Sequence, residues 1–202
     1  MKREGKKKSA MDAGALAEEA LKDIMARLRQ QGASAVTRID IADIVVDERV
    51  RLKCQIPVCD SYGKNLMCPP FIPSVAFFRD ALARYTGAVL IQVTSPLPGD
   101  VNRSSSVEVY APAKKLHELV NLAEKWAFAY QCRFATGLIG GCCRLCDECT
   151  AVKNGRFCRH PFKARPSMEA MGIDVVATVV NARLTTRFPI ANEVTWTGIL
   201  LI

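Results

Sequence analysis

Eight of the nine cysteines fall into two short blocks, and these blocks are the strongest constraint on how the chain can fold. The first block reads K-C-Q-I-P-V-C-D-S-Y-G-K-N-L-M-C-P-P, and the second reads G-G-C-C-R-L-C-D-E-C-T-A-V-K-N-G-R-F-C-R-H-P. Prolines and glycines interrupt the first block and exclude regular secondary structure there. Both blocks are therefore predicted to be loops that gain much of their order from whatever their thiols bind.

The spacing of the second block favours an iron–sulfur cluster. Cys143, Cys146 and Cys149 follow one another at x2 spacing, and Cys158 comes eight residues later, beyond the turn signal Asn154-Gly155. Three thiols at such spacing can turn toward one centre, as in cluster-binding motifs. Zinc more often takes one x2 pair from each of two separated loops. We expect a 4Fe-4S cluster here, with a zinc that staples the loop as the alternative.

The first block offers three further thiols, Cys54, Cys59 and Cys68. Cys68 is followed by a proline, as in bacterial ferredoxin motifs, where the last cysteine ligates the other cluster. Cys68 can therefore complete the site of the second block. Alternatively, the first block holds a cluster of its own, with Cys132, Cys142 or an external molecule at the fourth position. The chain thus holds one or two clusters, and an open position would suit an enzyme.

The composition disfavours disulfides and membrane spans. The chain has 202 residues, half of them hydrophobic, which suits one domain with a sizeable core. Its start is charged without a following apolar stretch, so we expect no secretory signal, and no apolar run approaches the ~18 residues of a membrane span. A cytoplasmic location is expected, where clustered cysteines are metal ligands or catalytic groups.

The net charge of +8 is concentrated in two places. Residues 1–8 carry five basic groups and one acid, and residues 133–165 carry seven basic groups and two acids. We interpret residues 1–11 as a basic disordered leader, and residues 12–202 as a single metal-binding domain. The second concentration suits an anionic metal–thiolate site, and it would also attract an acidic redox partner protein or a small anionic ligand. Nucleic acid and membrane are disfavoured as partners.

The remaining segments alternate between helix and strand patterns. Helices are predicted over 12–31, from Ser74 to Tyr85 and from Pro112 to Tyr130, and strands over 36–46, 88–93, 134–139 and 194–202. Asp174 can cap a further helix, although its β-branched run fits a strand equally well. The prediction is an α/β or α+β single domain, with a small mixed sheet flanked by helices and two cysteine-rich metal-binding loops at one end.

Other side chains give little indication of chemistry without a metal. His117 lies in a predicted helix with no obvious partner, and His160 is expected to donate to the sulfurs or place charge near them. Tyr62 and Lys64 lie inside the first block and could contact a ligand, although packing and charge balance explain them better. A polar run follows the last cysteine and is interpreted as a solvated loop beside the metal in preference to an anion pocket: Arg159, Lys163, Arg165, Ser167 and Glu169.

The two cysteine blocks together resemble those of a prokaryotic family of predicted metal-binding proteins. The resemblance rests on C-D-S-Y-G-K-N-L-M-C-P-P, G-G-C-C-R-L-C-D-E-C and C-R-H-P-F-K-A-R-P-S-M-E-A-M-G-I-D-V, and it extends from about Ile39 to the end of the chain. It implies no particular reaction. It implies metal binding through seven cysteines: Cys54, Cys59, Cys68, Cys143, Cys146, Cys149 and Cys158.

Three functions follow as hypotheses. The first is an iron–sulfur protein with a redox role in electron transfer. The second is an enzyme that uses an open-site cluster on a small anionic or sulfur-containing substrate. The third is a zinc-stapled binding module.

Overall fold

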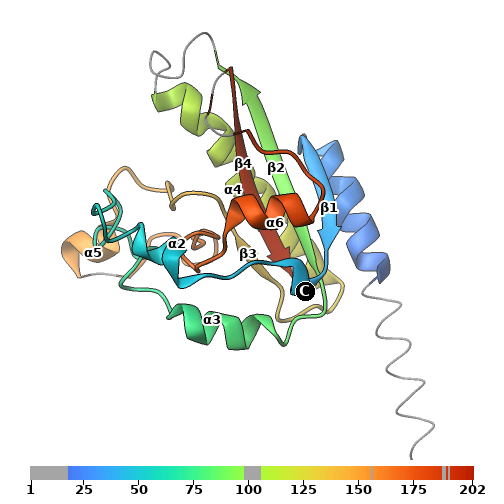
Figure 1. Ribbon diagram of the computed structural model, residues 1–202, viewed down its shortest axis with the longest axis horizontal. Helices are drawn as coiled ribbons and strands as arrows, with labels where there is room; N and C mark the ends of the chain where they lie inside the picture. The colour runs from blue at the N-terminus through green and yellow to red at the C-terminus, as the bar shows by residue number, and fades with distance from the viewer. Residues whose placement is uncertain (1–17, 98–105, 156, 188–189, 191) are drawn as a thin grey trace, which may run out of the picture.

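The structure, a computed structural model, describes residues 18–97, 106–155, 157–187, 190 and 192–202 (Figure 1). Its centre is a four-stranded sheet in the order β1-β2-β4-β3. The strands are β1 (Ala35–Ile39), β2 (Ala88–Pro96), β3 (Thr136–Leu138) and β4 (Glu193–Leu201). The long pair β2–β4 runs in register from Ala88 opposite Leu201 to Pro96 opposite Glu193.

Helices cover one face of the sheet with an apolar layer. The helix over 18–30 and α4 (Ser106–Ala129) pack their apolar stripes against alternate residues of β2, such as Val89 and Ile91. At Gly198 of β4 a Cβ would fall 2.8 Å from the carbonyl oxygen of Leu138, so only glycine permits this close approach of the strands. The buried helical residues of this layer are Ala20, Leu21, Ile24, Leu28, Leu116, Leu119, Val120, Ala123 and Ala127.

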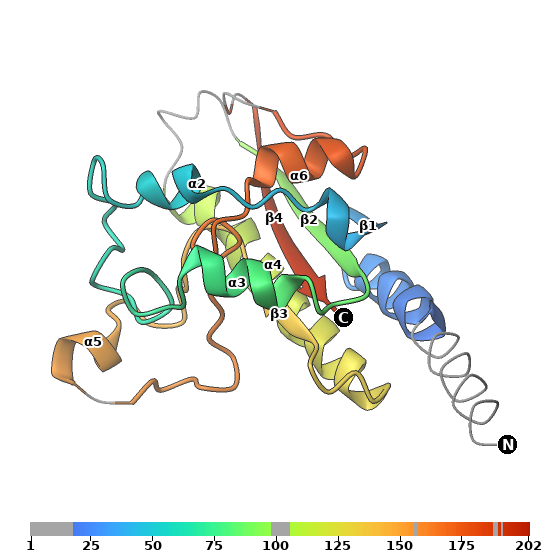
Figure 2. The same cartoon turned by 60° about the horizontal axis from the view of Figure 1, so that its bottom comes forward.

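The opposite face is covered by α3 (Val75–Leu82) and the segment 168–173 (Figures 1 and 2). Phe78 and Leu82 of α3 pack with Leu90 of β2 and Ile199 of β4. Residues 88–91 of β2 and 199–201 of β4 are buried on both faces of the sheet, so these two stretches are continuously apolar instead of alternating.

Two predicted helix caps are confirmed. The Ser74 side chain accepts a hydrogen bond from the Phe77 N–H at 3.1 Å and begins α3. The Asp174 side chain accepts one from the Ala177 N–H at 3.0 Å and begins α6 (Val175–Asn181). The cap decides between the two alternatives for the run after Asp174, because a carboxylate that satisfies a first-turn N–H favours helix over strand.

The predicted α/β or α+β class is confirmed, but the expected mixed sheet is wrong in detail. Among the described residues, all three strand pairs are antiparallel, and parallel pairing is limited to an isolated bridge between Ile139 and Ser167. Strands β2 and β3 run in the same direction and are joined by α4. Strand β4 is inserted between them, so each neighbour in the sheet is antiparallel, as in a split βαβ unit.

The predicted start of the long helix at Pro112 is also wrong. Helix α4 begins at Ser106, and Pro112 lies inside it. Pro112 has no N–H to donate within the helix. This part of α4 is instead held to β4, because the Val109 carbonyl accepts a hydrogen bond from Trp196 Nε1 at 2.9 Å. Packing against β4 thus outweighs the local preference of proline for a first turn.

Three short elements flank the cysteine blocks or precede them. They are the 3-10 turn η1 (Ile41–Asp43), α2 (Glu48–Leu52) and α5 (Thr150–Asn154). The predicted strand over 36–46 therefore ends at Ile39. Within the described residues, no helix combines the length and apolar character needed to cross a bilayer. The predicted leader over 1–11, and residues 12–17 of the first predicted helix, lie outside the described residues.

Candidate metal centre

The two cysteine blocks lie side by side at one end of the sheet, although they are far apart in sequence (Figures 1 and 2). The first block joins α2 to α3, and the second follows β3. Asn65 Nδ2 donates a hydrogen bond to the Cys143 carbonyl at 2.8 Å. The Leu66 N–H donates to Cys149 Sγ at 3.4 Å. These two bonds join the blocks directly, so the predicted juxtaposition is confirmed.

Glycine lets the chain enter the second block from β3. Gly141 has a φ of +78°, and a Cβ there would lie 2.7 Å from Cζ3 of Trp196. Both the positive φ and the contact exclude a larger side chain. The Gly141 N–H donates to the Glu169 carboxylate at 3.2 Å, and burial raises the pKa of that carboxyl. The turn that delivers the cysteines is thus fixed by the sheet and by the segment after the last cysteine.

The second block folds back through a short helix. Cys149 precedes α5, and Gly155 ends that helix in the left-handed region with a φ of +59°. The turn predicted at Asn154-Gly155 is therefore confirmed. It returns the chain toward the triplet: burial raises the pKa of the Cys143 thiol, and Cys158 lies close enough to add to that rise.

Backbone N–H groups point at the sulfurs of the second block. Besides the Leu66–Cys149 bond, the His160 N–H donates to Cys158 Sγ at 3.3 Å. The N–H groups of Leu145 and Arg165 also donate to Cys143 and oppose the rise in its pKa. Such donors favour the thiolate over the thiol, and hydrogen bonds to sulfur are a main determinant of cluster potentials.

Without a metal the buried thiols hold their protons. Burial raises the pKa of Cys68 to about 12, with a further contribution from nearby Cys142. Burial likewise raises the pKa of Cys143, and for Cys54 the neighbouring Cys59 adds to the effect of burial. A metal must displace these protons, so its binding releases them.

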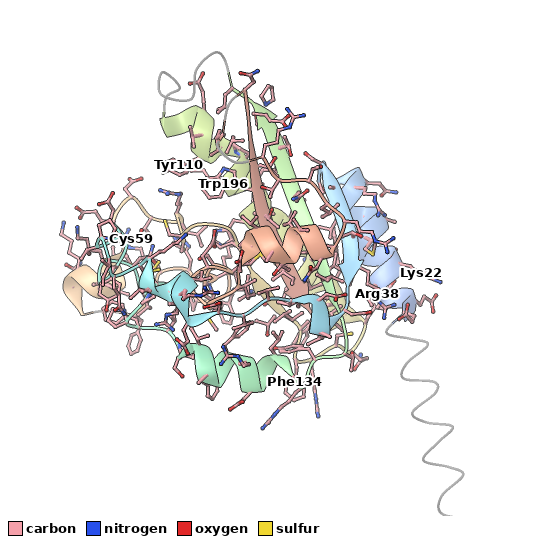
Figure 3. The ribbon with its side chains drawn as sticks, in the orientation of Figure 1. Lys22, Arg38, Cys59, Tyr110, Phe134 and Trp196 are labelled. Carbon is pink, nitrogen blue, oxygen red and sulfur yellow. The ribbon has the colours of Figure 1, made fainter. Side chains whose placement is uncertain are left out.

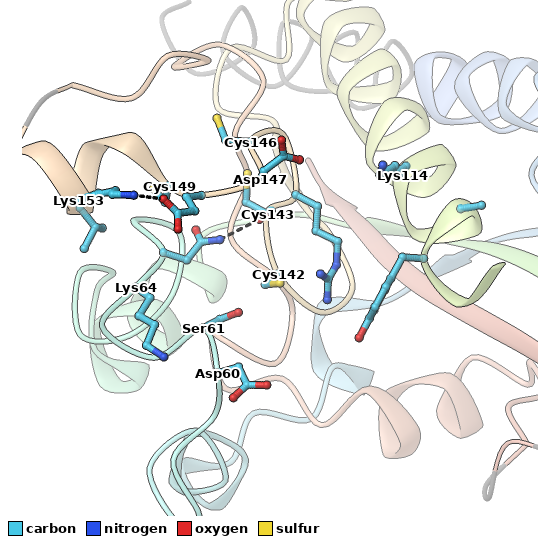
Figure 4. A pocket seen from close by; sticks show the side chains of 16 residues that line it. Asp60, Ser61, Lys64, Lys114, Cys142, Cys143, Cys146, Asp147, Cys149 and Lys153 are labelled. Carbon is cyan, nitrogen blue, oxygen red and sulfur yellow. Dashed lines mark hydrogen bonds and ion pairs between the residues drawn. The ribbon is translucent and has the colours of Figure 1, made fainter. Parts of the chain in front are cut away.

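A cavity of about 690 Å³ opens beside the second block. Figure 4 shows Cys142, Cys143, Cys146 and Cys149 on its lining, which also includes Lys64 from the first block. Four basic and three acidic side chains surround these thiols: Lys64, Lys114, Arg144, Lys153, Asp60, Asp147 and Glu148. Because Lys153 forms an ion pair with Glu148, the remaining groups around the thiols carry more basic than acidic side chains.

The first block is less closely gathered around the cavity. Cys68 is 5 % exposed, so burial raises its pKa, and nearby Cys142, Cys59, Cys54 and Cys143 add to the rise. Cys54 and Cys59 are held together by a hydrogen bond from the Cys59 N–H to the Cys54 carbonyl at 3.0 Å, and neither lines the cavity. Cys59 is exposed at the edge of the molecule (Figure 3).

The predicted ligand set stays a prediction. Among the described residues, no three Cys, His, Asp or Glu side chains already surround a point where one metal ion could be held. The donor chemistry nevertheless fits a soft metal centre, because thiols of the triplet share one cavity and receive N–H bonds. Cys132 precedes β3, whereas Cys142 follows it, and Cys132 packs against the apolar core.

Helix α4 clamps the segment after the last cysteine through side-chain contacts. These contacts were not predicted from the sequence. His117 Nε2 lies 2.7 Å from the Lys163 carbonyl oxygen, and Asn121 Nδ2 donates to that oxygen at 3.1 Å. Arg165 forms a largely buried ion pair with Glu124, with Nη2 to Oε1 at 2.5 Å. Spacing of i, i+4 and i+7 along α4 puts His117, Asn121 and Glu124 on one face. This spacing is the sequence signal from which the clamp could have been predicted.

The roles expected for several polar residues change accordingly. His117 does have a hydrogen-bond partner, the Lys163 carbonyl. Burial lowers the pKa of His117, so the ring is neutral and donates this hydrogen bond from Nε2. Ser167 accepts a hydrogen bond from the Ala170 N–H at 3.1 Å and caps a turn. The run after Cys158 is thus anchored to the core, in contrast to the solvated loop that was expected. Tyr62 does not line the cavity, whereas Lys64 does.

A comparison with protein families found one match. The model of a family described as "Predicted metal-binding protein (DUF2284)" matches residues 37–202, which include all nine cysteines. No curated protein and no solved structure matches the chain.

Proposed function

Because the chain belongs to this family of predicted metal-binding proteins, we propose that it is an iron–sulfur protein with a redox role. Cys143, Cys146 and Cys149 would hold a 4Fe-4S cluster, with Cys158 or Cys68 as the fourth ligand. Such a cluster, when bound, supplies reversible one-electron storage. The x2–x2 spacing of the triplet supports a cluster over a single zinc.

The observation that carries the proposal is the set of backbone N–H groups directed at the sulfurs. Cys143, Cys149 and Cys158 each accept at least one such bond. These donors stabilise the negative charge of thiolate ligands. They would also stabilise the added charge of a reduced centre, which raises its reduction potential.

The surroundings support electron exchange with an acidic protein. Lys64, Lys114 and Arg144 surround the thiols, and no ion pair engages them among the described residues. An excess of cations beside a surface-near centre attracts acidic partners and speeds their encounter. We therefore propose an acidic redox partner protein, with its docking surface at the rim of the 690 Å³ cavity.

The open cavity also favours a second candidate, an enzyme with an open-site cluster. Cys142 lines the cavity beside Cys143 without belonging to the x2–x2 triplet, and Lys64 faces the same space (Figure 4). A small anionic or sulfur-containing substrate could be bound there by the lysine and the backbone. If the first block holds a cluster with only three cysteines, its fourth position would be open to such a substrate.

Metal analysis tests the proposal. The full chain is purified without oxygen, and iron, acid-labile sulfide and zinc are measured. We expect iron and sulfide in equal amounts, roughly four of each per cluster. A stoichiometric zinc content without sulfide would contradict the iron–sulfur cluster and support the zinc-stapled module. Spectral change on addition of a small thiol would favour the enzyme, whereas an unchanged spectrum would favour electron transfer.

A further inference from the structure

A second cavity, of about 1050 Å³, lies along α4 next to the metal-centre cavity. Its walls are the exposed side of α4 and the segments 142–145 and 162–165. We call it the α4 groove. Its volume is at the upper end of the range for small-molecule sites, so a ligand of drug-like size fits within it.

One part of the α4 groove is apolar and open to solvent. Phe128 of α4 is 61 % exposed, and Phe162 in the facing segment is 89 % exposed. Leu122 and Leu145 complete the apolar lining between them. Large aromatic side chains that are exposed beside a cavity indicate a surface that binds an apolar ligand or an apolar part of one.

Around the rest of the α4 groove, basic side chains outnumber acidic ones by five to two, the acids being Glu118 and Glu124. Lys114 and Arg144 line both this groove and the metal-centre cavity, so they stand where the two spaces meet. The Arg144 guanidinium carbon lies 3.6 Å from the centre of the Tyr110 ring, which holds the side chain in place without neutralising it. Within the described part of the chain, neither cation forms an ion pair, whereas Arg165 is already neutralised by Glu124.

We infer that the α4 groove binds a small organic acid with an apolar ring or chain. The carboxylate lies between Lys114 and Arg144, beside Cys142, and the apolar body lies against Leu145 and Phe162. Charge complementarity selects the anion, and the aromatic walls select an apolar body over a purely polar one. The inference goes beyond the metal centre and does not depend on which metal it holds.

Fluorine NMR on the full chain tests the inference with 4-(trifluoromethyl)phenylacetate as the probe. We expect a Kd of about 1 mM, the affinity typical of a ligand of this size. The matching primary amide lacks the charge, and trifluoroacetate lacks the ring. Each should bind at least about tenfold more weakly, because each forfeits one of the two kinds of contact. Equal binding of the amide would overturn the inference.

Variants locate the site. Lys114→Met and Arg144→Met should each weaken the probe about tenfold, and Phe162→Ser should weaken it severalfold. Lys114 is exposed on α4, so Lys114→Met still tests the binding site if Arg144→Met disturbs the loop. The matched control is Lys22→Met, an exposed lysine that does not line the groove and lies across the molecule from Cys59 (Figure 3). An equal loss in the control would show that binding follows net charge alone, and would overturn the inference.

A protein partner is the main competing occupant. An acidic peptide that contains phenylalanine is therefore titrated in parallel. If that peptide binds in a Lys114-dependent manner and the small acid does not bind, the groove is a protein-docking surface and the inference is wrong. If the small acid binds and competes with the peptide, the inference holds.

Discussion

The sheet with its helices and the cysteine blocks are stabilised in different ways. Residues of β2 and α4 are buried in continuous apolar layers on both faces of the sheet. The cysteine blocks have few buried side chains and leave Ile56, Val58 and Phe157 exposed. They are held by hydrogen bonds to sulfur and carbonyl groups and by the clamp from α4. The difference predicts that the core keeps its structure without a bound metal, whereas the blocks gain much of their order from one.

The largest effect is expected from Leu116→Ala in the core. Leu116 is fully buried on α4 and faces β4, so its truncation removes apolar contacts and leaves a cavity. We expect a loss of about 3–4 kcal/mol in the free energy of unfolding, measured by urea denaturation. Leu122→Ala, at the half-buried edge of the α4 groove, should cost far less. Similar losses would contradict the division between core and edge.

A smaller effect is expected on the blocks when metal is removed. Trypsin can cleave after Lys64 and Lys153, which lie in the two blocks. Metal held at a hundredfold excess over its Kd should slow both cleavages roughly a hundredfold, equivalent to about 2.7 kcal/mol. Cleavage after Lys115 and Lys125 of α4 should be slow in both forms. Equal rates at Lys64 with and without metal would mean that ordinary packing orders the blocks.

A smaller loss of stability is expected when the clamp between α4 and the segment after Cys158 is removed. Glu124→Ala removes the partner of Arg165 and the acceptor of the Gly137 N–H at 2.7 Å. The pair is 14 % and 21 % exposed, so we expect a loss of about 2 kcal/mol, below the value for a fully buried pair. Metal affinity should fall as well, because the segment after Cys158 loosens. Glu118→Ala, at an exposed site on the same helix, is the control and should change neither quantity.

The smallest effect concerns pH. Burial lowers the pKa of His117 below its ordinary value of 6.5, so the unfolded state binds more protons than the folded state. Stability should therefore fall as pH drops from about 6.5 toward the lower pKa of the folded state, and then level off. His117→Gln keeps a donor for the Lys163 carbonyl and should remove this component, at a cost on the order of 1 kcal/mol at pH 7. Identical pH profiles for both proteins would contradict a buried neutral histidine.

The same contrast between regions explains what the sequence could predict. Helix 18–30, α3 and the strands β2 and β4 follow from apolar periodicity and capping residues, which act locally, whereas the sequence left helix and strand open for α6. The start of α4 could not be predicted, because Pro112 is a local signal that packing and the Trp196–Val109 hydrogen bond override. Insertion of β4 between β2 and β3 is likewise a property of the whole sheet.

At the metal centre, sequence spacing was sufficient to identify the cysteine blocks but not their supports. The Asn154-Gly155 turn is local and was predicted. The Leu66–Cys149 bond and the Glu124–Arg165 pair join segments that are distant in sequence, so only the folded chain reveals them. The groove along α4 has the same origin, because Phe128 and Phe162 come from different segments.

The central claim, that the second block binds an iron–sulfur cluster, is tested most directly by metal analysis of Cys146→Ser beside Cys132→Ser. Both variants and the unaltered chain are purified without oxygen, and iron and sulfide are measured. Cys146→Ser should lose iron and sulfide at this site, because a serine hydroxyl is a poor ligand for a soft centre. Cys132→Ser should keep the full content, because that thiol packs against the core. Full iron and sulfide in Cys146→Ser would contradict the claim.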